Sequence, residues 1–513
     1  MSESGKQPLN RAEQASILVL GKLAAMIIEG LTPFLIVRLL GKADVGAISG
    51  LILIYTTMAV VLGGGLPRSV LYYLSGRTLD QRWAVVLRLI KATFVLSVLT
   101  GVILLSVGVW GERALEAMGR WFVSLTGGTD GQEGERMDLV YLQLFALYPL
   151  LDMPVRLLPH ILVGELRPRA AAGFNAFRSF GMSFGQLLPA ALGWGLWGIV
   201  GGLLTFGVVN LLVFVWLLRG QYRAATTVVI DQSAWEMVRF SFPLGLTDVV
   251  GRLNSYLDRY LILFLMTSAA FAEYVQGAWQ IPLITTVAYS VGDVYMSRFV
   301  ELFKAGKPEE AIAIWRTSIQ KVSLIVVPVA TVFIVGAEEF ITVAFTADYI
   351  AAAPVFRLYC CLLLLRVTSY GGVIVAAGKP QYVLRAAAWT LGSNAALSIP
   401  LVLWLGFVGP ALGTALAFIP TVFIYCVYIA RATGLRLSQT FPVFAWGKVV
   451  LVAAVPAALA LWPKLTLEVS PLSAFLVQAA VVIVGFGVLG TLTGQIKRDD
   501  WRFLYRWVRL KTL

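Results

Sequence analysis

The stretch R38-L-L-G-K-A-D-V-G-A47 is a short polar turn between two long apolar segments, residues 15–40 and 43–66. Each segment can cross a bilayer as a helix, which needs roughly 20 apolar residues. Apolar runs of this length recur along the whole chain, in which 58% of residues are hydrophobic and 13% are charged. They are too long and too uniformly apolar for the alternating strands of a membrane barrel. The sequence therefore predicts an all-α, multi-pass membrane protein.

We expect about fourteen transmembrane helices in this chain. Two six-helix lobes, residues 1–225 and 226–435, are followed by two further spans within residues 436–494 and a cytoplasmic tail, residues 495–513. The tail should form an amphipathic helix on the membrane surface, because its apolar residues share one helical side. The expected spans are residues 15–40, 43–66, 84–109, 138–162, 170–193, 195–218, 236–265, 270–297, 312–336, 352–377, 381–405, 409–430, 443–462 and 472–493.

The two lobes show a weak internal similarity. Sliding the sequence by 229 residues lays A43-D44 over A272-E273 and Glu29 over Asp258. Internal repeats of this kind commonly enclose a central site that holds substrate near the repeat interface. We therefore expect two pseudo-symmetric lobes around a central cavity.

The basic residues support this topology, because loops rich in Lys and Arg stay on the cytoplasmic side of a membrane. With both termini in the cytoplasm, the inner segments collect 25 Lys and Arg residues. The outer segments hold only six, namely Arg38, Lys42, Arg113, Arg120, Arg136 and Lys464. The net charge of +13 is thus mostly a consequence of topology, and it requires no nucleic-acid partner.

Enzymatic chemistry is poorly supported by the sequence. It contains no zinc-protease HExxH and no soluble domain, the glycine-rich stretch G193-W-G-L-W-G198 is assigned to close helix packing, and the longest loop has fewer than thirty residues. The three cysteines lie in apolar spans without the spacing of a metal site. We therefore expect no catalysis, no cofactor and no metal. A membrane glycan polymerase or ligase remains an alternative.

Charged residues deep in the spans are the candidate site, because a Lys or Arg at the bilayer centre costs about 2.5–3.5 kcal/mol. Arg88, Lys91, Arg156, Arg239 and Arg357 lie nearer the membrane faces and are expected mainly to be anchors. The deep cations are Lys22, Arg178, Arg252, Arg259 and Arg366, and the deep acids are Glu29, Asp152, Asp248 and Asp258.

This set has two interpretations. Asp248, Arg252 and Arg259 share one helical face, so Asp248 could neutralise Arg252, and Asp258 could neutralise Arg259 or a partner in the other lobe. Such pairs cannot neutralise all the deep cations, however, because the deep bases outnumber the deep acids. Fixed cations in a buried cavity suit an anionic ligand, and the planar arginine fork matches phosphate oxygens. The acids are also candidates for ion coupling.

Several segments carry a family resemblance. They are P33-F-L-I-V-R-L-L-G-K-A-D-V-G46, L62-G-G-G-L-P-R-S-V-L-Y-Y-L-S-G76, F240-S-F-P-L244, Y256-L-D-R-Y-L-I262, A272-E-Y-V275, L302-F-K-A-G-K-P308, A377-G-K-P380 and G406-F-V-G-P-A-L-G-T414. In their order and spacing they resemble polysaccharide biosynthesis proteins of the multidrug, oligosaccharidyl-lipid and polysaccharide (MOP) exporter superfamily. The motif positions singled out are Arg38, Gly41, Gly46 and Arg68.

This resemblance implies a flippase of the bacterial inner membrane. Its substrate would be an oligosaccharide on undecaprenyl pyrophosphate, moved between leaflets by alternating access for surface polysaccharide of the O-antigen type, with polysaccharide assembly proteins and membrane lipid as partners. The two extra helices resemble those of murein precursor (lipid II) flippases, which is the second expectation. A cation-coupled multidrug exporter is the third.

Overall fold

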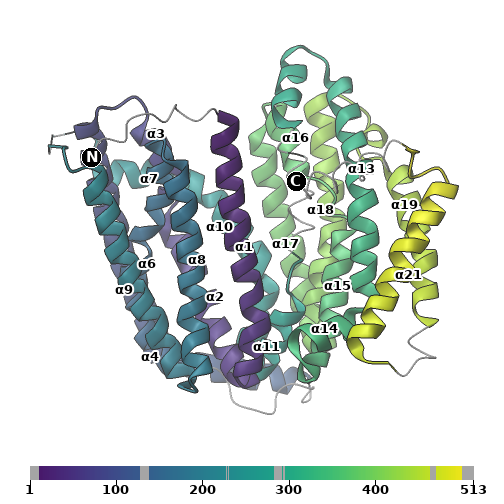
Figure 1. Ribbon diagram of the computed structural model, residues 1–513, viewed down its shortest axis with the longest axis horizontal. Helices are drawn as coiled ribbons and strands as arrows, with labels where there is room; N and C mark the ends of the chain where they lie inside the picture. Colours follow the sequence, from purple (N-terminus) through teal and green to yellow (C-terminus); the bar gives the residue numbers. More distant parts are fainter. Residues whose placement is uncertain are drawn as a thin grey trace. The chain divides into compact units, whose positions relative to one another are not determined.

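The computed structural model describes residues 11–126, 138–226, 228, 230, 232–281, 292, 295–462 and 469–498. This part of the chain is built of helices and contains no strand, so the predicted all-α fold is confirmed (Figure 1). Most of the predicted tail and of residues 278–297 lie outside the described helices, and the side chain of Lys22 is not described.

Eight helical segments of the described chain are long and apolar enough to cross a membrane, which confirms a multi-pass protein. The total of fourteen spans stays a prediction. The helices α1, α8 and α10, which carry Glu29, Arg178 and Arg252, are outside this set. The eight segments are Lys42–Gly63, Leu79–Gly111, Val140–Gly164, Gly195–Gln221, Pro308–Val335, Pro380–Thr433, Val443–Ala460 and Pro471–Leu492.

The chain forms two compact units. Unit 1 holds the described residues up to Tyr256 together with Ile262–Ala272. Its elements are α1 (Arg11–Leu39), α2 (Lys42–Gly63), α3 (Leu66–Leu74), α4 (Leu79–Thr126), α5 (Val140–Phe145), α6 (Tyr148–Asp152), the 3-10 helix η1 (Pro154–Leu157), α7 (Leu158–Gly164), α8 (Pro168–Ala191), α9 (Gly195–Gln221) and most of α10 (Ala234–Leu265).

Unit 2 holds Leu257–Leu261 and the described residues from Glu273 onward, and α11 (Ser268–Gly277) joins the two units. The lobe boundaries predicted from the sequence stay predictions. The elements of unit 2 are α13 (Pro308–Val335), α14 (Ala337–Phe345), η2 (Ala347–Ala352), α15 (Ala353–Leu363), α16 (Tyr370–Ala376), α17 (Pro380–Leu405), η3 (Gly406–Val408), α18 (Gly409–Thr433), η4 (Leu437–Gln439), α19 (Val443–Ala460) and α21 (Pro471–Leu492).

The span expected at 138–162 is broken into short helices. Proline recurs every five residues here, at Pro149, Pro154 and Pro159, and three prolines so close together remove three backbone donors and disfavour one regular helix. The backbone therefore passes from α6 through the 3-10 turn of η1 to α7. The break places Asp152 at the end of α6 and Arg156 within η1.

The span expected at 352–377 is also broken, between α15 and α16. Side chains satisfy carbonyl groups that the break leaves without helical partners: the Trp446 indole donates to the Leu364 carbonyl at 2.7 Å, and the Tyr370 hydroxyl donates to the Leu365 carbonyl at 2.8 Å. Hydrogen bonds from these two side chains thus stabilise the break in unit 2, and Arg366 lies within it.

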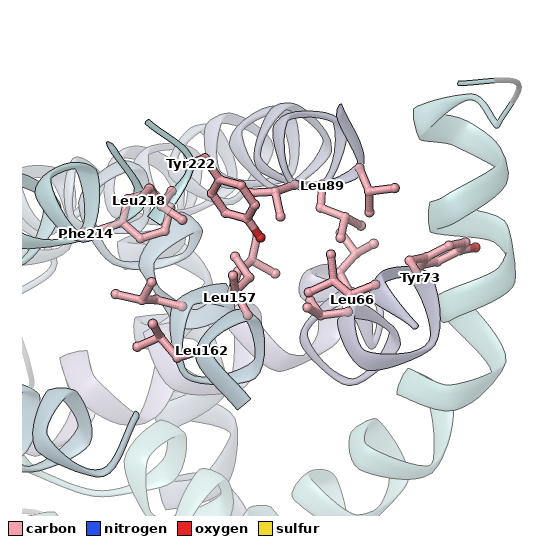
Figure 2. Close-up of a cluster of buried hydrophobic side chains, with 14 of the residues drawn as sticks. Leu66, Tyr73, Leu89, Leu157, Leu162, Phe214, Leu218 and Tyr222 are labelled. Atoms are coloured by element: carbon pink, nitrogen blue, oxygen red, sulfur yellow. The ribbon is translucent and has the colours of Figure 1, made fainter. Parts of the chain in front are cut away.

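A buried hydrophobic cluster holds the helices of unit 1 together. Its side chains come from α3, α4, the broken span, α8, α9 and α10, and Figure 2 shows part of the cluster. At its edge the Tyr222 ring stacks on Trp83, and the Tyr222 hydroxyl donates to Glu165 at 2.8 Å. Burial and this bond raise the pKa of Tyr222, so its hydroxyl stays a hydrogen-bond donor. The labelled members are Leu66, Tyr73, Leu89, Leu157, Leu162, Phe214, Leu218 and Tyr222.

The short helix α3 packs closely against α10, because the backbones of the two segments approach each other at Gly65 and Gly245. Gly65 has φ +74° and lies so close to α10 that a Cβ on it would be 2.5 Å from the backbone nitrogen of Gly245. Only glycine suits this place, because it accepts positive φ and has no side chain. Beside this contact the Ser241 hydroxyl donates to the Ser69 hydroxyl at 2.7 Å.

In unit 2 the last two helices, α19 and α21, pack against each other and against α13 (Figure 1). Val327 of α13, Val449 of α19 and Phe486 of α21 are buried in one cluster. A second cluster lies further along the same helices and contains Val332, Ala460 and Val482. The two C-terminal helices are therefore an integral part of unit 2.

The motif glycines Gly41 and Gly46 should respond differently to substitution. A Cβ at Gly46 would clash with the backbone carbonyl of Ser268, whereas a Cβ at Gly41 meets nothing within 4 Å. We expect Gly46→Ala to destabilise the protein by about 1–3 kcal/mol, as overpacking does. Gly41→Ala should cost less than about 1 kcal/mol, because it only replaces one helix N-cap residue by a poorer one. Thermal unfolding in detergent measures both, and equal losses would contradict the close packing at Gly46.

Candidate functional site

Asp152 is the centre of a polar cluster inside unit 1. Its carboxylate is completely buried and receives hydrogen bonds from three elements. Arg156 Nε donates to Oδ2 at 2.7 Å, Arg178 Nη2 of α8 donates to Oδ1 at 2.7 Å, and the Tyr55 hydroxyl of α2 also donates to Oδ2. Two cations therefore share one acid, and the cluster keeps one net positive charge.

The two guanidinium groups are more accessible than the acid that they bind. The side chains of Arg156 and Arg178 are each 23% exposed, whereas that of Asp152 is 0% exposed. An arginine offers five N–H donors, and Asp152 uses only one of Arg156 and two of Arg178. The buried acid thus orients two cations whose remaining donors are available to an anion.

Aromatic rings hold the cluster in place. Arg156 lies over the Tyr55 ring, with 5.3 Å between its Cζ atom and the ring centroid, as in a cation–π contact. The Tyr55 ring meets the Tyr148 ring edge to face at 5.0 Å, and Tyr148 stacks on Phe145 at 4.7 Å. These rings restrict the rotamers of the charged groups, which keeps the donors in fixed positions.

Polar contacts continue from α8 to α1. The Ser179 hydroxyl, next to Arg178 in the chain, donates to Glu29 of α1 at 2.5 Å. One turn further along both helices, the Thr32 hydroxyl donates to that of Ser183 at 2.6 Å. Glu29 is therefore brought next to the cluster around Asp152, as a neighbour of its arginine-bearing helix.

Asp248 pairs with a different arginine from the one that spacing favours. Its carboxylate accepts from Arg68 Nη2 of α3 at 2.7 Å, because the contact of α3 with α10 brings this motif arginine within reach. Arg252 instead donates to the Tyr256 hydroxyl at 2.7 Å, with its Cζ atom 5.0 Å from that ring's centroid. The alternative that Asp248 and Arg252 form an ion pair is therefore wrong.

Asp258 lies in unit 2 and is completely buried. Its Oδ2 atom accepts from the Tyr274 hydroxyl at 2.9 Å and from the Tyr359 hydroxyl, whereas Oδ1 has no hydrogen-bond partner within the described residues. The neighbouring Arg259 donates through Nη2 to the Ala278 carbonyl at 2.9 Å. Tyrosine hydroxyls rather than an ion pair thus surround this carboxylate in the described part of the chain.

Arg366 lies in the break of the second broken span. Its Cζ atom is 5.2 Å from the centroid of the Phe418 ring, and it is close enough to Tyr359 to act on it electrostatically. Within the described residues it forms no ion pair, so its charge is held by an aromatic face rather than by an acid. Arg366, Tyr359 and Asp258 are therefore neighbours in unit 2.

The structure thus groups the predicted site residues unit by unit. In unit 1 it joins Asp152 with Arg178 and places Glu29 nearby, and in unit 2 it gathers Asp258, Arg259 and Arg366. Sequence reasoning missed Arg156, which it assigned to a membrane anchor, and the tyrosines 55, 274 and 359. The spacing of Asp152 and Arg156, four residues apart, was a usable signal. The exposed Arg38 donates to the Phe34 carbonyl within its own helix.

Part of this chain matches a known protein family, and one relative is described as a flippase. Residues 140–354, which contain Asp152, Arg178, Arg252, Asp258 and Arg259, match the family model described as polysaccharide biosynthesis protein. The predicted resemblance is confirmed. A relative from Haloferax volcanii, described as "Probable low-salt glycan biosynthesis flippase Agl15", is 22% identical over 300 residues. That alignment covers 58% of this chain and 62% of the relative's length.

Solved structures show the fold. The lipid II flippase MurJ in an inward closed conformation matches with a TM-score of 0.70 at 14% identity, covering 93% of this chain and 98% of MurJ. An inward-facing multidrug resistance MATE family transporter of the MOP superfamily matches with a TM-score of 0.54 at 15% identity, covering 81% of this chain and 99% of that one. The chain therefore shares the fold of these two transporters, as the sequence predicted.

Removal of the acid should disturb the cluster more than removal of one base. Asp152→Asn leaves two cations without a counter-charge, and breaking a buried pair in this way costs about 3–5 kcal/mol. Arg178→Gln leaves a neutral Asp152–Arg156 pair, and Tyr55→Phe removes one hydrogen bond to a charged group, about 1.5–3 kcal/mol. Thermal unfolding of the three variants should rank Asp152→Asn lowest. If Arg178→Gln were the least stable, the charge balance inferred here would be incorrect.

Proposed function

We propose that the protein is a flippase that moves a polyprenyl-linked oligosaccharide across the cell membrane for the synthesis of surface polysaccharide. The observation that carries the proposal is the family match over residues 140–354, because the same stretch contains the buried cluster of Asp152, Arg156 and Arg178. The flippase named among the relatives supports the same class. The carrier we propose is undecaprenyl pyrophosphate, and the membrane is the inner membrane of a bacterium.

Recognition of the substrate would rest on its pyrophosphate. Arg156 and Arg178 have guanidinium donors beyond those that Asp152 occupies, and an arginine fork can bind two phosphate oxygens at once. Asp152 is then a positioning residue that holds both forks in place, and the two arginines bound to it more than offset its negative charge. Arg252, Arg259, Arg366 and Lys22 would add positive potential along the path of the anionic group.

Transport would proceed by alternating access of the two lobes, with both termini in the cytoplasm. Among the four deep acids, Asp152 and Asp248 are occupied by arginines. Glu29 and Asp258 bind hydroxyl groups instead, so a proton or a small cation could bind there without displacing a salt bridge. We therefore assign ion coupling to Asp258 first and to Glu29 second.

The main alternative is a flippase for lipid II, the murein precursor. Two C-terminal helices packed on α13 and the likeness to MurJ support this alternative. Lipid II is also a polyprenyl pyrophosphate, so the cationic cluster suits both substrates. A multidrug exporter for cations is supported less well, because two arginines outnumber one acid in the buried cluster and would repel such a drug.

Loss of single cations should abolish export while the protein stays folded. In a deletion strain complemented with Arg178→Gln, Arg252→Ala or Lys22→Ala, we expect surface glycan to fall at least tenfold, because phosphate contacts are lost. The matched control is Arg219→Ala, since Arg219 is exposed at the end of α9 and makes no ion pair in the described chain. Membrane abundance is measured by immunoblot, and glycan and lipid-linked intermediates by mass spectrometry.

The outcomes separate the candidates. A complete lipid-linked repeat unit trapped on the cytoplasmic leaflet supports the proposal and identifies the cargo by its mass. Trapped murein precursor with cell lysis selects the lipid II alternative. Unchanged glycans together with sensitivity to cationic drugs contradict both flippase readings. A fall in abundance of the variants would instead give these cations a structural role.

A further inference from the structure

Unit 2 contains a large cavity that the proposed transport cycle does not use. Its volume is about 1040 Å³, at the upper limit of the roughly 300–1,000 Å³ that is typical of small-molecule sites. The walls come from α13, α18 and the start of α19, and the turn after α21 closes one side. None of the predicted transport residues lines it.

The charges in this cavity are all of one sign. Its lining includes Arg316 of α13, Lys448 of α19 and Lys497 after α21, and it includes no Asp or Glu. Arg316 and Lys448 form no ion pair with any described residue. By the topology expected from the sequence, all three cations lie on the cytoplasmic side, where the membrane surface is negative.

The rest of the cavity is mainly apolar, with Gln320, Ser438, Thr440 and Gln495 as its uncharged polar lining, and some of its apolar side chains are exposed. Among its lining residues, Ile419 is 57% exposed, Phe423 58% and Phe444 89%. Phe444 belongs to the first turn of α19, where Val443 N–H donates to the Phe441 carbonyl and Trp446 N–H donates to the Pro442 carbonyl. Apolar side chains and cations thus line the same cavity.

We propose that this cavity binds an anionic phospholipid of the cytoplasmic leaflet, with the phosphate at Arg316 and Lys448 and an acyl chain along α18. Apolar walls beside cations match the two parts of such a lipid, and a free phosphate would leave those walls uncovered. The chain's own C-terminal segment is a poorer occupant. Its sequence after Lys497 holds five basic residues, Arg498, Arg502, Arg506, Arg509 and Lys511, against the two acids Asp499 and Asp500, so its net charge has the same sign as that of the cavity.

Lipid titration of the purified protein tests this assignment, independently of any glycan transport. We expect phosphatidylglycerol to bind in native mass spectrometry and to raise the unfolding temperature, whereas phosphatidylcholine does neither at the same concentration. The double variant Arg316→Gln/Lys448→Gln should bind phosphatidylglycerol at least tenfold more weakly. Its matched control is Lys304→Gln/Lys379→Gln, two basic positions expected on the same side that do not line the cavity.

Each outcome of the lipid titration either supports or overturns the phospholipid site. Selective weakening in the Arg316/Lys448 double variant, with the control unchanged, supports it. Equal binding of both phospholipids, or equal losses in both double variants, overturns a specific site. Inorganic phosphate that stabilises the protein as well as the lipid does would mean an ion site without a lipid. Tighter binding of polyprenyl pyrophosphate than of phosphatidylglycerol, lost in the same variant, would assign the cavity to the transported cargo instead.

Discussion

A carboxylate buried among apolar helices is stable only where donors and cations surround it, and Asp152 imposes this condition on unit 1. Its partners come from α2, from the 3-10 turn η1 and from α8, so three segments distant in sequence must keep one arrangement. An uncompensated charge at this place would cost several kcal/mol, far more than a single surface ion pair contributes. The acid therefore fixes local structure and, by the same bonds, fixes two accessible guanidinium groups.

Broken helices make this arrangement possible. A continuous helix at residues 140–164 would form all its own backbone hydrogen bonds and hold its side chains at regular helical positions. Pro149 and Pro154 interrupt this regularity, so Asp152 and Arg156 can point at one shared site. In unit 2 the break near Arg366 has no proline, and tryptophan and tyrosine side chains bind the released carbonyls instead. Discontinuous helices lining polar sites recur in transporters for this reason. The two breaks occur in the spans numbered four and ten from the sequence, which is where equivalent positions of two repeats would lie.

The sequence contains enough to predict the helices but not most of their polar contacts. Hydropathy locates the eight segments that can cross a membrane, because twenty apolar residues in a row have few alternatives there. Pairing is different, because it depends on which helices touch. The spacing of Asp248 and Arg252 favours a local pair, yet the close approach of Gly65 to Gly245 brings Arg68 to Asp248. Asp258 likewise meets tyrosines from α11 and α15 that no spacing connects to it. The contacts of Arg156 with Asp152 and of Arg252 with Tyr256, each four residues apart, were within reach of a local rule.

Partly buried cations favour a negative partner, and two groups of arginines and lysines in this chain meet that preference in different ways. Inside unit 1, Asp152 binds Arg156 and Arg178 and thereby fixes the orientation of both guanidinium groups. The N–H donors that Asp152 does not use are held in fixed directions as a result. At the cavity of unit 2, Arg316 and Lys448 form no ion pair with a described residue, and no acid is among the lining residues. Water can solvate these cations, but it leaves the apolar walls beside them exposed. An amphiphile with an anionic head satisfies both requirements at once, and the negative cytoplasmic leaflet holds such molecules at high local concentration. On the roles proposed for them, these four cations have a use beyond setting the topology.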